Sequence, residues 1–594
     1  MLRPQINTFR SVQDLSGLWE AKADPEGAGE SRRWHEGFGG GVPIGVPGSW
    51  NEQLAELGLM YYVGALWYQR RFFFPGAPER QRFFLRFDSA DYHATVWLNG
   101  HFVGNHTGGF LPFQYDVTPF LQTGENRLVV RVDNRLSHDT IPQGITEKNY
   151  LEFGRPREQT FPPTAFDFFV YGGLNRPVRL IGLPRNHLRA IQVGTAVRGG
   201  GKARITVSAD FEAESTGLEA AVEILDGAKI LCTAKTPLSA EKKAGFELDL
   251  EDCQYWCPED PYLYRLRMTL RSGTEEVDGY TLSVGVRQVE VREDKLLLNG
   301  RPVFLKGFGK HEDFPVLGKG LSIPVLVKDL HMLKWIGANS FRTSHYPYAE
   351  EWLEMSDRMG ILIIDEVPAV SLNFRYATER TLAAHKQALQ DLIGRDRNHP
   401  CVIAWSVANE PGIWGEEEAA SEKARRYWRE IYRLAKSLDP SRPVTIPACA
   451  RWGEQDLAFQ FSDFLSVNRY WGWYEFPGQL ERAGQIFRRE LQRLWKKYKK
   501  PILVTEFGAD TIDGIHATYP QLFTEEYQIQ LIRTYFEVIE SLPFTIGEHI
   551  WNFADFRTAQ NHRRVVLNKK GVFNRIRDPK SAAFFVKEHW QGNR

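Results

Sequence analysis

The feature that most constrains this chain is an alternation, after residue 286, of short apolar segments with segments of helical character. Eight apolar segments have the length and residue types of buried strands, and helix-compatible sequence such as 421–438 or 525–540 separates them. Eight strand–helix units in about 300 residues predict a (β/α)8 barrel of parallel strands. The predicted strands are 303–308, 338–342, 361–365, 402–407, 444–447, 464–467, 502–505 and 545–551.

The residues before the barrel predict two all-β domains. The first contains strand-like segments such as 83–87, and Asn99-Gly100 between two apolar segments is a strong hairpin signal. The second contains about 100 residues of short alternating strands, which fits an immunoglobulin-like sandwich. We therefore expect a multidomain chain of α/β and all-β parts, with a β jelly-roll sandwich at 1–184, an immunoglobulin-like β-sandwich at 185–285 and a (β/α)8 TIM barrel at 286–594.

Composition and charge exclude several classes of protein. Lysine plus arginine and aspartate plus glutamate each number 74, so the net charge is zero, which argues against binding to nucleic acid or anionic membranes. No apolar segment approaches the roughly 18 residues of a membrane span. The 5 cysteines lack the pattern of a disulfide framework or zinc site, and the N-terminus lacks the pattern of a signal peptide. We expect a cytoplasmic protein with no metal and no other cofactor.

Polar residues follow several predicted barrel strands, at the end where barrels of this kind carry their active sites. Strand four ends in Asn409-Glu410, strand six in Asn468 and Tyr470, and strand seven in Glu506. Strands four and seven are not neighbours in a ring of eight, so Glu410 and Glu506 can face each other across the mouth. Two opposed carboxylates are what glycoside cleavage requires, because one protonates the leaving oxygen while the other attacks the anomeric carbon. For either acid considered alone, the alternative is a structural role, in a salt bridge or as the cap of the next helix.

Two longer motifs make most of the chain recognisable. Residues 339–347 read Asn-Ser-Phe-Arg-Thr-Ser-His-Tyr-Pro, and residues 396–400 read Asp-Arg-Asn-His-Pro, followed by Trp405 and Asn409-Glu410. These motifs resemble the signatures of glycoside hydrolase family two. Nearly the whole chain is similar to that family, with the same order of domains, and most closely to its β-glucuronidases.

The resemblance implies a retaining glycoside hydrolase that releases terminal β-D-glucuronic acid by double displacement through a covalent glycosyl-enzyme intermediate. It implies that Glu410 is the general acid/base and Glu506 the nucleophile. It also implies that Asn409 binds the sugar 2-hydroxyl and that Tyr470 orients Glu506. Glu410 must be protonated near neutral pH, so we expect burial and the charge of Glu506 to raise its pKa. His345 matches the family's signature histidine, for which a buried structural role is an equal alternative.

The segment after strand eight points to the substrate class. Asn568 and Lys570 resemble the Asn-x-Lys motif with which glucuronidases hold the sugar carboxylate, although alone they would read as a solvated basic turn. A charge-assisted bond to a C6 carboxylate discriminates strongly against a neutral hydroxymethyl group. By resemblance Asp167 reaches the sugar hydroxyls, Trp551 stacks on the substrate, and Arg564 and Tyr474 lie beside the carboxylate. The expected substrate-binding residues are Asp167, His345, Asn409, Asn468, Tyr470, Tyr474, Trp551, Arg564, Asn568 and Lys570.

One segment departs from the pattern of some glucuronidases. Only 367–380 separates the third strand from the helix near His385, where those enzymes carry a long loop over the aglycone. We therefore expect an open mouth, partly lined by residues 373–376, with bulky or oligosaccharide uronides as plausible substrates beside small ones.

Other functions remain open at this point. A β-galacturonidase or dual uronidase is the first alternative, because a carboxylate clamp does not fix the C4 hydroxyl. A β-galactosidase is disfavoured by Asn568 and Lys570, and a non-catalytic carbohydrate-binding module by Glu410 and Glu506. We expect a small-molecule or oligosaccharide β-uronide as substrate, no nucleic-acid or membrane partner, and a homo-oligomer, which is common in the family.

Overall fold

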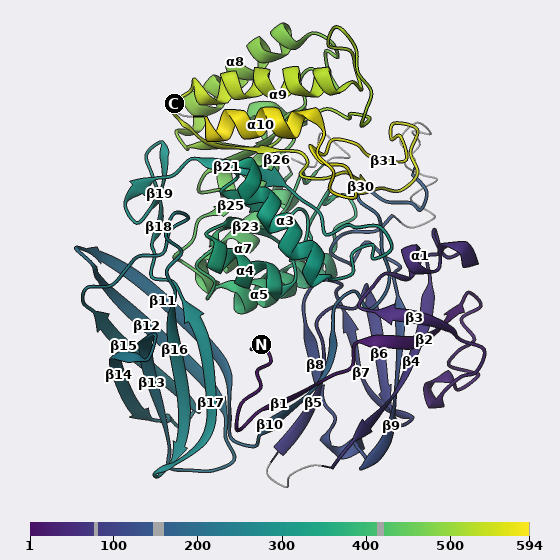
Figure 1. Cartoon of the computed structure of the whole chain (residues 1–594), viewed down its shortest axis with the longest axis vertical. Helices are drawn as coiled ribbons and strands as arrows, with labels where there is room; N and C mark the ends of the chain where they lie inside the picture. The colour runs from purple at the N-terminus through teal and green to yellow at the C-terminus, as the bar shows by residue number, and fades with distance from the viewer. Residues whose placement is uncertain (77–80, 146–159, 413–420, 593–594) are drawn as a thin grey trace.

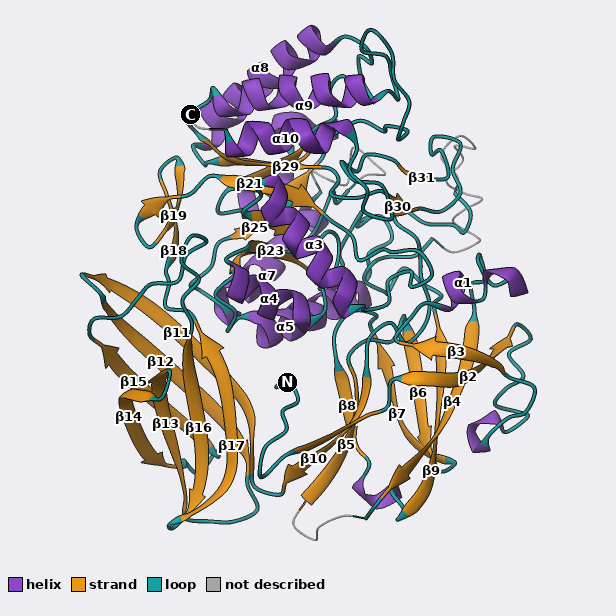
Figure 2. Ribbon diagram, in the orientation of Figure 1, coloured by secondary structure: helices purple, strands orange, loops and turns teal. Residues whose placement is uncertain are grey.

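The expected fold class is confirmed. The computed structural model describes residues 1–76, 81–145, 160–412 and 421–592, and Figure 1 shows two all-β units below a unit of mixed helices and strands. Figure 2 makes the division plain, because the long helices all belong to the upper unit. No helix among the described residues is long and apolar enough to cross a bilayer.

The N-terminal sandwich consists of two antiparallel sheets that share one apolar core. The hairpin expected at Asn99-Gly100 is present, and both residues have positive φ angles, 54° and 82°, as a tight hairpin turn requires. The larger sheet runs in the order β3 (Val42–Val46), β2 (Gly17–Asp24), β4 (Ala65–Phe74), β9 (Gly124–Asp133), β6 (His93–Leu98) and β7 (His101–Thr107). The smaller sheet runs in the order β1 (Ser11–Asp14), β10 (Val178–Pro184), β5 (Gln81–Phe87) and β8 (Phe113–Asp116).

The second sandwich shows the alternation of a half-buried strand most clearly. In β15 (Lys243–Leu250) the side chains of Ala244, Phe246, Leu248 and Leu250 are buried and those between them are exposed. One sheet contains β11 (His187–Gly199), β12 (Lys202–Glu212) and β15 in that order. The other contains β14 (Lys229–Pro237), β13 (Leu218–Asp226), β16 (Tyr264–Ser272) and β17 (Glu275–Val284). A small sheet of β18 (Val289–Arg292), β19 (Lys295–Leu298) and β20 (Arg301–Pro302) follows.

The barrel contains all eight predicted strands, with ends shifted by a few residues. The fifth is interrupted at Ile446, so that one half pairs with strand four and the other with strand six. The ring runs in the order β21 (Leu305–Gly309), β22 (Ser340–Arg342), β23 (Leu362–Glu366), β24 (Val402–Ser406), β25 (Val444–Thr445) with β26 (Pro447–Ala448), β27 (Leu465–Asn468), β28 (Ile502–Glu506) and β29 (Thr545–Ile550), and β29 pairs with β21.

Helices cover the outside of this ring, which is why strands β23, β24 and β28 are buried along their whole length and read as continuous apolar segments. The helices are α3 (Ile323–Ile336), α4 (Glu350–Met359), α5 (Glu379–Asp396), α7 (Glu422–Leu438), α8 (Leu480–Tyr498), α9 (Glu525–Glu540) and α10 (Ser581–Gln591). Smaller elements among the described residues include the short helix α1 (Trp50–Gln53), the two-residue strands β30 (Phe556–Arg557) and β31 (Leu567–Asn568), and several 3-10 helices.

The short connection after strand three folds inward, whereas its residues 373–376 were expected to line the mouth of the barrel. Asn373 and Phe374 were expected on the rim, but they are only 5% and 2% exposed. Phe374 packs edge-on against two aromatic rings of α7, and the backbone N–H of Asn373 donates to Gln143 of the jelly roll at 2.7 Å. The jelly roll therefore contacts this segment, and among residues 373–376 only Arg375 is exposed.

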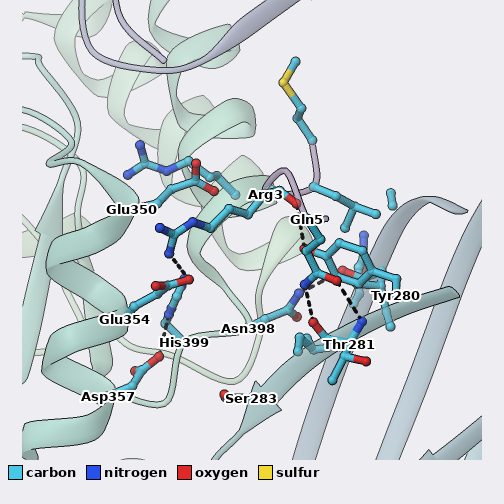
Figure 3. A pocket seen from close by; sticks show the side chains of 18 of the residues that line it. Arg3, Gln5, Tyr280, Thr281, Ser283, Glu350, Glu354, Asp357, Asn398 and His399 are labelled. Carbon is cyan, nitrogen blue, oxygen red and sulfur yellow. Dashed lines mark hydrogen bonds and ion pairs between the residues drawn. The ribbon is translucent and has the colours of Figure 1, made fainter. Parts of the chain in front are cut away.

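The N-terminal segment joins all three units. It passes between the units in Figure 1. Arg3 pairs with Glu351 of the barrel at 3.4 Å, and Arg10 pairs with buried Asp278 of the second sandwich. Beside this segment lies a cavity of about 370 Å³, lined by apolar and polar residues of the N-terminal segment, β11, β17 and the barrel (Figure 3). Some of its polar residues pair with one another, for instance His399 with Asp357 at 2.6 Å.

A buried arginine connects the jelly roll to the barrel. Arg86 on β5 is fully buried and donates to Asp88 and to Glu350 of α4, each at 2.6 Å. Replacing it with methionine, R86M, should lower the free energy of unfolding by about 3 kcal/mol, because two carboxylates lose their cation inside the protein. Calorimetry of the first unfolding transition measures this. The exposed Arg71–Glu125 pair supplies the control, since R71A should cost less than about 0.5 kcal/mol; equal losses would contradict the account.

Candidate active site

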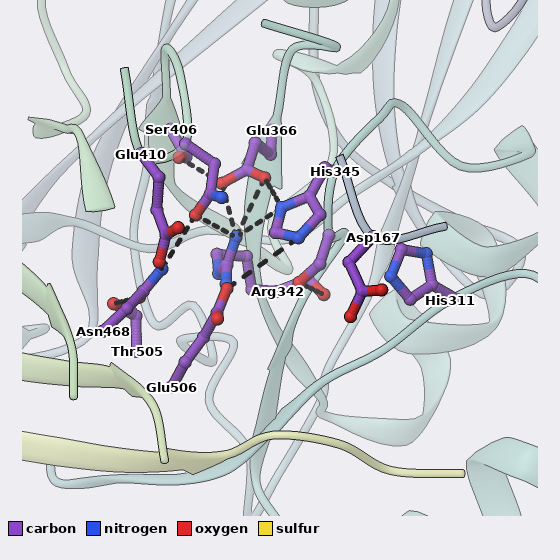
Figure 4. A network of polar contacts seen from close by, with 12 residues as sticks. Asp167, His311, Arg342, His345, Glu366, Ser406, Glu410, Asn468, Thr505 and Glu506 are labelled. Atoms are coloured by element: carbon purple, nitrogen blue, oxygen red, sulfur yellow. Dashed lines mark hydrogen bonds and ion pairs between the residues drawn. The ribbon is translucent and has the colours of Figure 1, made fainter. Parts of the chain in front are cut away.

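Polar side chains from different strands converge at the carboxyl ends of the barrel strands (Figure 4). Arg342, Glu366, Asn468 and Glu506 are the last residues of β22, β23, β27 and β28, and Glu410 follows β24. Parallel strands that close into a ring all end at one face of the barrel. Residues far apart in the chain are thereby brought into direct contact.

The guanidinium of Arg342 is fully buried between two carboxylates. Its Nη1 donates to both oxygens of Glu366, at 2.9 and 2.8 Å, and its Nη2 donates to Oε1 of Glu506. Nη1 also reaches Oδ1 of Asn409 at 3.4 Å. The hydroxyl of Ser406 donates to Glu366 at 2.6 Å. A buried charge is tolerated only when it is paired and hydrogen-bonded, so this network fixes the position of Glu506.

His345 lies against the same two acids. Its Nδ1 donates to Glu366 at 2.8 Å, and its Nε2 is 3.9 Å from Oε1 of Glu506. Burial lowers the pKa of His345, so the ring is neutral at neutral pH. The ring stacks on Trp551 with centroids 5.1 Å apart. His345 is thus buried within the network, and Trp551, which is 4% exposed, packs against its ring.

Glu410 is held by a chain of side-chain amides. The hydroxyl of Thr505 donates to Oδ1 of Asn468 at 2.7 Å, which turns the amide nitrogen outward. That nitrogen donates to Glu410 at 2.8 Å and to Asn409 at 3.1 Å. Glu410 itself is half-buried and has a φ of 45°, in the left-handed region that costs a non-glycine residue energy. Strain of this kind collects at functional sites.

The pKa values of Glu410 and Glu506 are both raised above the usual range of a glutamate. Burial raises the pKa of Glu506 to about 8, and the charge of Glu410 adds to the rise while Arg342 and Tyr470 oppose it. Burial also raises the pKa of Glu410, as expected, with the Asn468 amide opposing. Repulsion between the two acids is thus one cause of the raised pKa of Glu506, and the interaction acts on both acids.

Glu506 and Glu410 accept hydrogen bonds from different kinds of donor, and this difference indicates which acid carries the proton. Glu506 accepts from the positively charged Arg342 and from the hydroxyl of Tyr470 at 2.7 Å. Glu410 accepts from the neutral Asn468 amide. Charged donors stabilise a carboxylate more strongly than neutral ones. We therefore place the negative charge on Glu506 and the proton on Glu410.

A second cluster, which we call the cationic clamp, consists of Arg564, Asn568, Lys570 and Tyr474. The ammonium of Lys570, whose residue is 1% exposed, donates to the hydroxyl of Tyr474 at 3.0 Å, and Arg564 donates to the same hydroxyl at 2.9 Å. The backbone N–H of Lys570 donates to Asn568 Oδ1 at 3.1 Å, which directs the amide nitrogen of Asn568 away from Lys570. Tyr474 and Tyr470 pack edge to face at 5.2 Å, so the clamp adjoins the acid pair.

Two aspartates neutralise the clamp. Asp510 accepts from Lys570, and from Arg564 at 2.9 Å. Asp167, from the jelly roll, accepts from Arg564, and from the Asn568 amide at 2.8 Å. Lys570 and Arg564 together hold the pKa of Asp510 below its usual range despite its burial. An anionic ligand can therefore bind these two cations only by displacing one of the two aspartates.

All twelve residues singled out in the sequence lie within these two adjoining clusters or against them. Sequence reasoning gave no role to Arg342, Glu366, Thr505 or Asp510. A signal for Asp510 exists, because it follows strand seven by four positions, at the same face of the barrel as Glu506. Its function depends on the path of a loop, which the sequence does not specify.

Metal-ligating side chains gather elsewhere. Within the described part of the chain, two groups have suitable geometry: Asp357 with His399 and Cys401, and Glu540 with Glu548 and His589. Neither group includes a residue of the acid pair or the clamp. All five cysteines are free thiols.

Family models match the three parts of the chain in order. Residues 12–184 match the sugar binding domain of glycosyl hydrolases family 2, residues 186–287 match a further glycosyl hydrolases family 2 model, and residues 289–593 match the TIM barrel domain of that family.

Whole-chain relatives agree. A protein of Paenibacillus borealis named beta-glucuronidase is 40% identical over 99% of this chain and 98% of its own length, and the Homo sapiens beta-glucuronidase is 37% identical over 99% and 92%. A solved beta-glucuronidase from an uncultured Clostridium species is 40% identical, covers 100% of both chains and has a TM-score of 0.91. A beta-glucuronidase from Ruminococcus gnavus, solved in complex with D-glucuronic acid, is 36% identical, covers 99% of both chains and has a TM-score of 0.91.

The strained backbone at Glu410 leads to a stability prediction. Replacing Glu410 with asparagine, E410N, should raise the free energy of unfolding by about 1 kcal/mol, because asparagine tolerates the left-handed region better and a poorly paired acid is removed. The same change at Glu506, E506N, should instead lower it by about 2 kcal/mol, because buried Arg342 loses a charged partner. Urea unfolding measures both. A destabilised E410N would contradict the interpretation of Glu410 as strained.

Proposed function

The chain belongs to family 2 of the glycosyl hydrolases, and on that basis we propose that it is a retaining β-glucuronidase. It removes terminal β-D-glucuronic acid from glucuronides by double displacement. One observation carries this proposal: the cationic clamp adjoins the Glu410–Glu506 pair. The pair supports glycoside cleavage, and the clamp supports a sugar that bears a carboxylate.

In the first step Glu506 attacks the anomeric carbon while Glu410 gives its proton to the glycosidic oxygen. The bond from the sugar to the leaving oxygen breaks, and an ester between the sugar and Glu506 forms. The charge and proton placement described above is the one that this step needs. Arg342 holds Glu506 in its attacking position, and Tyr470 donates to the oxygen that remains outside the new bond.

In the second step the same acids exchange roles. Once Glu506 is esterified its negative charge is gone, so Glu410 loses the repulsion that opposed its ionisation and its pKa falls. The Glu410 carboxylate then takes a proton from water, and the resulting hydroxide displaces Glu506 from the sugar. We propose that Asn409, held by Asn468 and Arg342, binds the sugar 2-hydroxyl during both steps.

The substrate is a β-uronide. Glucuronide is preferred over galacturonide as the natural sugar, although the clamp itself does not distinguish the C4 epimers. Bulky or oligosaccharide uronides remain plausible, because the connection after β23 folds inward and adds no long loop over the mouth. The cytoplasmic location and the homo-oligomeric state expected from the sequence stay predictions.

A panel of chromogenic β-glucuronide, β-galacturonide, β-galactoside and β-glucoside tests the proposal. The glucuronide should give the highest kcat/KM, and replacing Lys570 with alanine, K570A, should reduce that value roughly a hundredfold or more while changing any β-glucoside activity little. Equal losses on both sugars would contradict the clamp. Replacing Glu506 with glutamine, E506Q, should cost at least about a thousandfold on every substrate in a folded protein; retained turnover would contradict the catalytic assignment.

The hydrogen bond from Tyr470 predicts a shift in the pH profile. That bond lowers the pKa of Glu506, so Tyr470→Phe should raise it and move the acid limb of kcat/KM upward by about one pH unit. The sign follows because Glu506 must be ionised to attack. Tyr474→Phe removes a neighbouring hydroxyl and should change KM without moving this limb. An unchanged acid limb in Tyr470→Phe would show that the bond does not tune Glu506.

A further inference from the structure

The position at which the clamp would hold a sugar carboxylate is occupied by a carboxylate of the protein. Asp167 places one oxygen 2.8 Å from the amide nitrogen of Asn568, and its other oxygen 3.2 Å from Nε of Arg564. It thereby makes the paired contact with a guanidinium that a free carboxylate would make. Asp167 and Arg564 lie 397 positions apart in the chain, so this contact joins the jelly roll to the barrel.

The clamp is electrically balanced in this state. Arg564 and Lys570 supply two positive charges, and Asp167 and Asp510 supply two negative charges. If both aspartates stayed in place, an arriving uronate would put three carboxylates on two cations at hydrogen-bonding distance. Like charges at such distances repel strongly where water is excluded, so one aspartate must leave.

The two aspartates differ in how firmly they are held. Asp510 is 3% exposed and accepts from Lys570, from Arg564 and from the backbone N–H of Lys569 at 2.9 Å. Asp167 has a side chain 43% exposed, and its hydrogen bonds to Arg564 and Asn568 both go to the clamp. Removing Asp510 would strip buried cations of their anion, whereas Asp167 can turn into solvent or toward a bound sugar.

We propose that Asp167 is a displaceable stand-in for the substrate carboxylate: the uronate takes its place on Asn568 and Arg564, while Asp510 remains. This inference rests on the proposed function for the identity of the substrate. Displaced Asp167 then accepts hydrogen bonds from the sugar hydroxyls. A neutral sugar cannot replace it, because a hydroxymethyl group does not compensate two cations.

Calorimetric binding of cyclohexanecarboxylate, a ring with a carboxylate and no hydroxyls, tests the inference without turnover. Replacing Asp167 with asparagine, D167N, should tighten its binding at least tenfold, because the competing carboxylate is gone. Cyclohexylmethanol, its neutral counterpart, should bind the native protein and D167N alike. The control is D513N, which removes an equal charge beside Lys569, at 3.1 Å, outside the clamp.

A D167N protein that binds cyclohexanecarboxylate no more tightly than the native protein would overturn the inference, and so would an equal gain in D513N, which would show a general effect of charge. Crystal structures of the native protein with and without D-glucuronic acid give a second, independent test. Asp167 should leave the Asn568 amide when the acid is bound, and an unmoved Asp167 beside a bound carboxylate would overturn the inference. Neither measurement needs turnover. A protein that does not cleave glucuronides would therefore refute the proposed function, while the binding and structural results would still test the displacement of Asp167.

Discussion

The site depends on one buried cation. Arg342 reaches the strand ends without exposure to solvent and is bound on one side by Glu366 and on the other by Glu506. Glu366 binds the guanidinium through both of its oxygens, and Arg342 opposes the rise that burial causes in the pKa of Glu506. Glu366, Ser406 and His345 can thus be understood as the support that keeps Arg342 in place for Glu506.

Charge is organised in the same way at the two ends of the proposed sugar site. At the anomeric end one arginine lies between two acids, and at the carboxylate end two cations lie between two aspartates. At the carboxylate end Asp510 is buried, whereas the side chain of Asp167 is 43% exposed. At the anomeric end Glu366 and Glu506 are both buried, and buried pairs hold the groups at both ends. A net charge of zero for the whole chain is therefore compatible with a local cluster of cations such as Arg564 and Lys570.

The sequence predicted the barrel well because strands covered on both faces read as continuous apolar segments, and because parallel strands bring their terminal residues to one face. Glu410 and Glu506 could be placed at the barrel mouth from the sequence on that ground. The contact of Asp167 with Arg564 could not, since it joins two domains through irregular segments. Asn373 and Phe374 were misplaced because a short connection can fold inward or outward, and here the jelly roll covers it. The local sequence pattern determines the helices and strands, whereas the direction of a loop depends on the parts of the fold that pack against it.

The central claim is that Glu506, charged and held by Arg342, forms the covalent bond to the sugar. A slow-turnover substrate such as 2-deoxy-2-fluoro-β-D-glucuronyl fluoride should accumulate this intermediate. Proteolysis and mass spectrometry of the inactivated protein should then locate one fluoroglucuronyl group on the peptide that contains Glu506, and on its carboxylate. Labelling of Glu410 instead, or inactivation without any covalent adduct, would contradict the account.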